Sequence, residues 1–302
     1  MSIRLWILLV LLSMLWGGGL VIGKYALTYF DPVTLTALRM GIAMPVLWLA
    51  VAAMRKPLPR QPRLWGKLAV LGAVNTALPF FLLNWAQQFI DSSMTAVLNG
   101  ATPLFGAVLA HFLIMGEQLT LVRVTGLAIG IGGVALLVGP SFGLDPAALA
   151  GQAAVLGAAF CYGSGSVLIK RLTGVSMTTA AAVQVTAAIV ALLPFTLLTG
   201  GSPRMDAPPV AWAAITLMGV AGTALAYLIY FHLVRQAGAT RATTVTLLIP
   251  VSATLLAALF LGERPGAGHF AAMAVVLLGV GLVIHGRWPV LPFSRRSRPP
   301  SG

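Results

Sequence analysis

LWILLVLLSMLWGGGLVIGK, residues 5 to 24, contains no charged side chain before Lys24. A transmembrane α-helix needs about 20 consecutive, mostly apolar residues, so this stretch is long enough to cross a bilayer. The apolar run continues to Ile22, and no convincing cleavage site of a secretion signal accompanies it. We therefore interpret residues 5–24 as a first membrane span.

The composition of the whole chain is that of a membrane protein. Of the 302 residues, 59% are hydrophobic and only 8% are charged, whereas soluble domains carry about 25% charged residues. We predict an all-α integral membrane protein with ten transmembrane helices and no separate water-soluble domain. The nine further spans are expected near Pro32–Met54, Leu68–Phe89, Ser93–Met115, Leu121–Gly139, Gly151–Lys170, Met177–Leu198, Val210–Leu233, Ala239–Leu261 and Gly268–His285.

The positions of the charges predict the orientation. With the N-terminus inside, 15 of the 19 basic residues fall on the inner side and five of the six acidic residues on the outer side. This asymmetry follows the positive-inside rule, so we expect a bacterial-type inner-membrane protein with both termini in the cytoplasm. The net charge of +13 is then a topology signal rather than a nucleic-acid-binding face. Residues 288–302 are predicted to be a disordered basic cytoplasmic tail.

The chain repeats itself at a nearly constant offset of 146 or 147 residues. We predict two homologous five-helix repeats, residues 1–140 and 147–287. Because five is an odd number, the second repeat enters the membrane in the opposite direction. Inverted repeats are typical of secondary transporters, whose substrate site lies near the midplane between the repeats. The matching segments include Trp16-Gly17-Gly18-Gly19 with Tyr162-Gly163-Ser164-Gly165, Gly116-Glu117 with Gly262-Glu263, Thr76 with Thr223, and Pro103 with Pro250.

These motifs resemble those of the EamA family of the drug/metabolite transporter superfamily. The resemblance rests on the Trp16 glycine-rich turn and on the stretch from Pro103 to Glu117 with its echo from Pro250 to Glu263. It covers nearly the whole chain, residues 5–285. It implies a ten-helix exporter with a central cavity lined mainly by helices 1, 3, 4, 6, 8 and 9. It also implies export of amino acids and related metabolites, or of drugs in some members.

Polar and aromatic side chains within the spans are the candidate substrate contacts, because intramembrane polar groups usually face the protein interior or a water-filled cavity. An amide near the middle of a span needs a partner, which for Asn99 is either the substrate or another helix. The stripe of Thr223, Tyr227 and Tyr230 either lines the cavity or joins helices. The predicted substrate-binding residues are Trp16, Asn84, Asn99, Tyr162, Tyr227 and Tyr230.

Three further features have alternative interpretations. Pro103 and Pro250 are predicted to be paired hinges, with static kinks as the alternative. Arg39 is the clear charge away from a span end, and we expect it to reach the outer surface near Asp31 rather than to bind an anionic solute inside. The glycine-rich fifth and tenth spans, with Gly126 and Gly279, are packing elements or the surface of a homodimer, and a monomer is equally compatible with the sequence.

The sequence therefore predicts a secondary transporter that exports small neutral metabolites, amino acids above all, by alternating access. No Asp or Glu lies in the middle of a predicted span, so facilitative transport is the simplest prediction, with proton-coupled export of drugs or other metabolites as the alternative. No catalytic residue, metal site or cofactor is predicted. Ser164 lies in a partial protease-like motif, but H-E-x-x-H, an aspartate pair and a P-loop are absent, which disfavours an intramembrane enzyme. A channel is disfavoured because charged rings are missing. The expected partners are a small-molecule substrate and the lipid bilayer, without nucleic acid.

Overall fold

The computed structural model describes residues 2–114, 119–141, 144–170, 172, 174–198 and 205–285. Every element in this part of the chain is helical, and no β-strand occurs in it. Nine of the described helical stretches are long and apolar enough to cross a membrane, and Val245–Phe260 is a shorter apolar helix. The predicted all-α membrane protein is confirmed. Gly116, Glu117 and the predicted tail 288–302 lie outside the described residues.

Aspartates that precede the helices set two of the helix starts. Asp31 accepts hydrogen bonds from the backbone N–H groups of Val33 and Thr34, at 3.0 Å each, and so caps α2. Asp145 accepts from the N–H of Ala148 at 2.9 Å, so this helix begins at Pro146, before the predicted Gly151. The continuous helices described are α1 (Ile3–Ala26), α2 (Pro32–Ala53), α7 (Leu121–Val138), α8 (Pro146–Lys170), α9 (Met177–Leu198) and α14 (Ala267–His285).

Two spans pass through a π-helical turn. The first is α3 (Pro62–Gly72), η1 (Ala73–Ala77) and α4 (Leu78–Ala86); the second is α10 (Pro209–Gly219), η3 (Val220–Leu225) and α11 (Ala226–Ala237). Pro79 follows η1 and lacks the N–H that a regular α-helical turn would use there. In η3, the Thr223 hydroxyl donates to the carbonyl of Met218, five residues earlier, at 3.1 Å. Such turns often mark functional sites.

Two further spans are each divided into two helices. The first consists of α5 (Ser92–Asn99) and α6 (Thr102–Leu113), and the second of α12 (Ala239–Ala242) and α13 (Val245–Phe260). Pro103 lies in the first turn of α6, where its missing N–H removes no helical hydrogen bond. Pro250 lies inside α13. The two proline positions thus differ in helical context, and the paired hinge stays a prediction.

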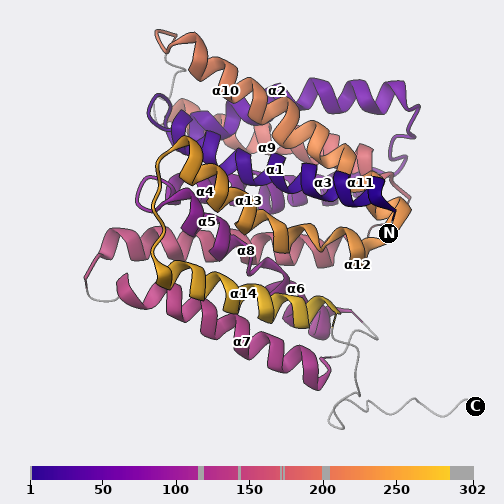
Figure 1. Cartoon of the computed structure of the whole chain (residues 1–302). Helices are drawn as coiled ribbons and strands as arrows, with labels where there is room; N and C mark the ends of the chain where they lie inside the picture. Colours follow the sequence, from indigo (N-terminus) through magenta and orange to yellow (C-terminus); the bar gives the residue numbers. More distant parts are fainter. Residues whose placement is uncertain are drawn as a thin grey trace, which may run out of the picture.

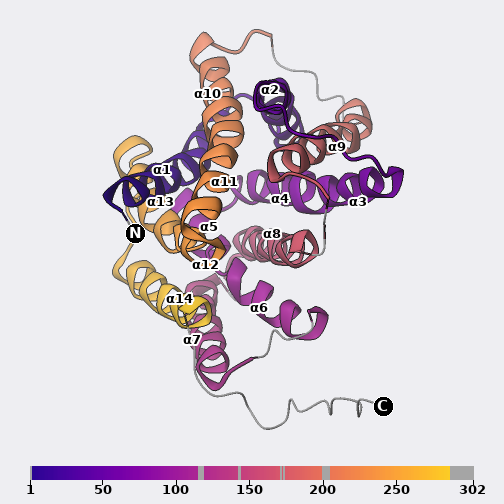
Figure 2. The ribbon, with the colours of Figure 1, turned by 90° about the vertical axis from the view of Figure 1, so that its right-hand side faces the viewer.

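Helices that are distant in sequence pack side by side. In both views α7 and α14 lie together at one edge of the bundle, and α8 lies between α4 and α6 (Figure 1, Figure 2). α1 packs on α13, and α2 on α9. Gly17 permits the α1–α13 approach, because a Cβ atom there would lie 2.9 Å from the backbone nitrogen of Ala253. At Gly126 a Cβ atom would lie 2.8 Å from the carbonyl oxygen of Gly279, so these glycines pack within one chain.

A lysine binds the chain just beyond α4, on the predicted outer side. The Lys24 ammonium, at the end of α1, donates to the carbonyls of Gln87 at 2.5 Å and Ile90 at 2.8 Å. Unpaired carbonyls at a helix C-terminus carry partial negative charge, so a cation stabilises them. Lys24 therefore fastens α1 to the turn that joins α4 and α5.

The neighbouring end of α5 is capped by a distant carboxylate. Glu263, which follows α13, accepts from the backbone N–H groups of Ser92 at 2.8 Å and Ser93 at 3.0 Å, and from the Ser93 hydroxyl at 2.7 Å. Asp91, the residue that normally would cap this helix, makes no side-chain capping bond. We call these contacts the Glu263 cap. The cap joins α5, which belongs to the first predicted repeat, to Glu263, which belongs to the second.

Candidate functional site

Arg39 of α2 is buried inside the helix bundle. Its side chain is 5% exposed. Nε donates to the Thr223 hydroxyl at 2.9 Å, and Nη2 donates to the Gly222 carbonyl at 3.2 Å. The guanidinium carbon lies 4.4 Å from the centre of the Phe80 ring. The expectation that Arg39 reaches the outer surface is therefore wrong, because the π-helical turn η3 supplies a hydroxyl and a carbonyl for it inside the bundle.

The charge of Arg39 is held by neutral groups. Within the described residues no carboxylate acts on the guanidinium, and the ionisable side chains in electrostatic range are Tyr162 and Tyr227. A hydroxyl, a carbonyl and an aromatic face offset only part of the cost of burying a charge. Ionisable residues within spans usually mark a substrate or ion pathway. Arg39 is therefore the strongest single indication of a functional site in the described structure.

Four of the six predicted substrate-binding residues belong to two groups of aromatic contacts, and Tyr162 of one group and Tyr227 of the other lie in electrostatic range of Arg39. The rings of Trp16 and Tyr230 lie 5.6 Å apart between centres, and Tyr227 stacks on Phe231 at 5.9 Å. Tyr230 also contacts Phe231 at 6.1 Å. The Phe80 ring, which covers the Arg39 guanidinium, contacts the Tyr162 ring edge to face, with 6.1 Å between the ring centres. We call this set from α1, α4, α8 and α11 the aromatic cluster: Trp16, Phe80, Tyr162, Tyr227, Tyr230 and Phe231.

The two predicted asparagines lie outside the aromatic cluster. The Asn84 amide donates to the Thr36 hydroxyl at 2.9 Å and so joins α4 to α2. Asn99 is the last residue of α5, and its buried Oδ1 has no hydrogen-bond partner in the described part of the chain. Asn84 thus makes a contact between helices, whereas the partner that Asn99 needs is not identified.

Reasoning from the sequence missed Arg39 and Phe80. A lone arginine in an apolar stretch is a visible signal, but the nearby Asp31 suggested a pair at the surface. In the fold the Asp31 carboxylate caps its own helix instead. Phe80 carries no distinguishing pattern, because a phenylalanine in an apolar span is ordinary. Only the packing of α4 against α2 places its ring over the guanidinium.

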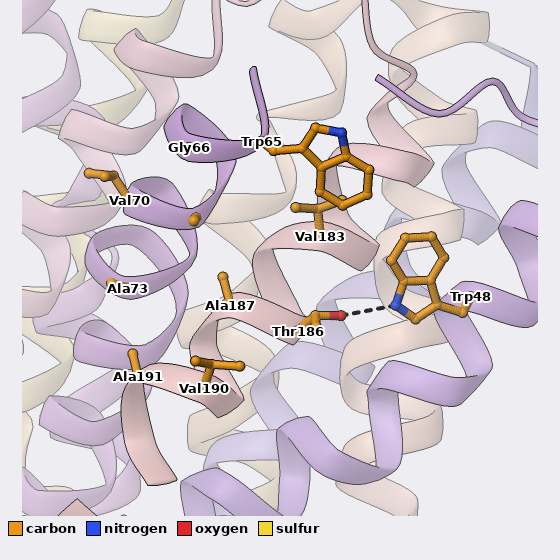
Figure 3. A pocket seen from close by; sticks show the side chains of 11 residues that line it. Trp48, Trp65, Gly66, Val70, Ala73, Val183, Thr186, Ala187, Val190 and Ala191 are labelled. Carbon is orange, nitrogen blue, oxygen red and sulfur yellow. Dashed lines mark hydrogen bonds between the residues drawn. The ribbon is translucent and has the colours of Figure 1, made fainter. Parts of the chain in front are cut away.

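A groove of about 630 Å³ lies elsewhere, between α2, α3 and α9 (Figure 3). Its walls are apolar, with Trp48, Trp65 and Val183 among the lining side chains. The Trp48 indole donates to the Thr186 hydroxyl at 2.9 Å, and this hydroxyl donates to the Ala182 carbonyl at 2.8 Å. These polar groups already have partners. The groove therefore suits hydrocarbon, such as a lipid chain, better than a polar metabolite.

Comparison with known families identifies the chain. The model of the EamA-like transporter family matches residues 4–139 and 149–285. The chain belongs to this family. The resemblance stated from the sequence is thereby confirmed, and the EamA-like protein is a multi-pass membrane transporter rather than an enzyme.

The relatives of this EamA-like transporter include proteins named for amino-acid export. A "Probable amino-acid metabolite efflux pump" of Escherichia coli is 26% identical over 93% of this chain and 95% of that protein. A "Probable terminal-alkyne amino-acid exporter" of Streptantibioticus cattleyicolor is 24% identical over 91% of each chain. A solved crystal structure, 22% identical, matches with a TM-score of 0.68 over 93% of this chain and 96% of its own. At that identity the solved structure supports the fold alone.

Proposed function

We propose that this EamA-like transporter exports small zwitterionic metabolites, amino acids above all, including aromatic and amphipathic ones. The observation that carries the proposal is the aromatic cluster inside the bundle. Tyrosine and tryptophan rings offer apolar faces and polar edges, which suit an amphipathic solute. The names of two relatives agree with amino-acid export.

The proposed mechanism is alternating access between inverted repeats, residues 1–140 and 147–287, around a central cavity. Helix packing supports a twofold relation. α1 packs on α13, and α8, the counterpart of α1, packs on α6, the counterpart of α13. The pairs α2 with α9 and α7 with α14 each join two counterparts. The two π-helical turns also correspond, since Thr76 and Thr223 lie 147 residues apart (223 − 76) within η1 and η3.

We further propose facilitative transport across a bacterial inner membrane, with both termini in the cytoplasm. The orientation rests on the basic residues of the inner loops. No acidic residue lies inside a described helix, so the usual carboxylate of a proton relay is not seen in this part of the chain. Proton-coupled export of drugs or other metabolites is the alternative.

Uptake of labelled amino acids into liposomes that contain the purified protein tests the substrate and the cluster together. Trp16→Ala and Tyr227→Ala are each expected to weaken apparent affinity about tenfold or more, since a buried aromatic contact contributes about 1–3 kcal/mol. Trp6→Ala is the matched control, because Trp6 is on the same helix and is 46% exposed. Equal effects at Trp6 and Trp16 would contradict the assigned cluster.

The same liposomes, with and without an imposed pH gradient, separate the two coupling modes. Saturable uptake that ignores the gradient supports facilitative transport. Strong dependence on the gradient favours the proton-coupled alternative. Failure to transport any amino acid, in vesicles that carry another solute, removes the proposed substrate class and leaves the transporter family in place.

A further inference from the structure

We infer that Arg39 binds the carboxylate of the transported solute and that the hydrocarbon part of the solute lies against the aromatic cluster. This inference rests on the proposed export of amino acids and adds the group that is recognised. A cavity with only neutral walls would accept neutral solutes, whereas binding to Arg39 requires an anionic group on the substrate.

The hydrogen-bonding capacity of Arg39 supports this role. A guanidinium carries five N–H donors. Two of them are used, by the Thr223 hydroxyl and the Gly222 carbonyl, and one face of the group rests on the Phe80 ring. Nη1 makes no hydrogen bond to any described residue. Three donors therefore remain, and those on Nη1 and Nη2 have the geometry that matches the two oxygens of a carboxylate.

The surroundings of Nη2 are built from glycines of two helices. A Cβ atom added at Gly19 would lie 3.6 Å from Nη2, and one added at Gly222 would lie 3.7 Å from it. Gly19 belongs to the glycine-rich stretch of α1 that begins at Trp16. The guanidinium thus lies beside α1 and η3, with Tyr162 and Tyr227 in electrostatic range. A solute bound there would meet the cation and aromatic rings together.

The electrostatics favour an anion over a neutral solute. The hydrogen-bond partners of Arg39 are neutral, so they do not neutralise its positive charge, which is buried inside the bundle. A carboxylate removes this imbalance and forms charge-assisted hydrogen bonds, which are roughly twice as strong as neutral ones. A purely structural role, in which Arg39 only pins α2 to η3, predicts no preference between an acid and its amide.

Ligand-induced thermal stabilisation of the purified full chain tests the inference without requiring transport. The probes are L-phenylalanine, L-phenylalaninamide and 3-phenylpropionate, and unfolding is followed by labelling of the buried Cys161 thiol. Because a ligand that binds the folded state raises the unfolding temperature, its dissociation constant follows from the concentration dependence. We expect both carboxylates to bind about 10- to 100-fold more tightly than the amide.

Three variants locate the effect. Arg39→Gln is expected to abolish the preference for acid over amide, whereas Arg235→Gln, which removes an exposed cation of α11, is expected to retain it. Thr223→Val keeps the charge but removes one acceptor that orients the guanidinium, and should reduce the preference in part. The comparison of probes on the unchanged chain still decides the question if Arg39→Gln does not fold.

The outcomes separate this inference from the proposed substrate class. Equal binding of L-phenylalanine and its amide, binding of none of the probes, or an undiminished preference in Arg39→Gln would each overturn the carboxylate anchor. Binding of 3-phenylpropionate but not of L-phenylalanine would keep the anchor and argue against amino acids. Amino-acid uptake into liposomes without any preference for acids would keep the proposed function and reject the anchor.

Discussion

Gly133→Leu is expected to lower the unfolding temperature clearly, whereas Gly132→Leu, one residue earlier, should unfold at the temperature of the wild type. A Cβ atom at Gly133 would lie 2.7 Å from the backbone nitrogen of Val276 and 2.8 Å from its Cγ2. At Gly132 nothing lies within 4 Å of such an atom. Extra methylenes in a well-packed interface cost about 1–3 kcal/mol, and backbone in contact cannot move aside as a flexible side chain can. The interface at risk joins α7 to α14.

Cys161 makes the measurement direct. It is the one cysteine of the sequence and is 8% exposed. A thiol-reactive fluorophore therefore reports unfolding on heating, and both variants can be followed with the same native reporter. A common unfolding temperature for Gly133→Leu and Gly132→Leu would refute the close α7–α14 contact.

Glu263→Gln is expected to lower the free energy of unfolding by about 1–3 kcal/mol, and Asp91→Asn to change it little. Both substitutions neutralise a carboxylate near the start of α5. Glu263 receives three hydrogen bonds there, and its charge favours the positive end of the helix. Asp91 makes no capping bond. Thermal unfolding with the Cys161 reporter compares them directly.

A larger loss for Asp91→Asn than for Glu263→Gln would contradict the Glu263 cap. In the proposed alternating-access cycle, opening of the predicted outer end has to separate α13 from α5. Glu263→Gln should then also ease that opening, which faster uptake into liposomes at saturating amino acid would reveal. Selectivity among amino acids should stay unchanged, because Arg39 and the cap have no contact residue in common.

The membrane class and most of the helix ends were predictable because they depend on local sequence. Apolar runs of about 20 residues are long enough to cross a bilayer and are typical of transmembrane helices. Pro, Gly and charged residues mark where each run ends. The helices begin or end a few residues from the predicted positions where a capping side chain acts, as Asp145 does for α8. The π-helical turns were not predictable, since they form where tertiary contacts compensate for an irregular backbone.

The candidate site was predictable only in part. Trp16, Tyr162, Tyr227 and Tyr230 were recognisable as aromatic residues with polar edges in matching or periodic positions, and all four make the ring contacts described. Asn84 is also a polar residue within a predicted span, yet its amide donates a hydrogen bond to the Thr36 hydroxyl of another helix. Whether an amide bonds a neighbouring helix depends on how helices pack, which single-span patterns do not encode.

The sequence by itself determined an all-helical membrane transporter of the EamA-like family, because hydropathy and family motifs depend only on the order of the amino acids. Only the tertiary structure decided where the charge of Arg39 lies. The residues that receive it, Gly222 and Thr223, are more than 180 positions away in sequence. An arginine side chain can reach either the surface or the interior from the same helix position. The choice follows from which polar atoms the neighbouring helices present to it.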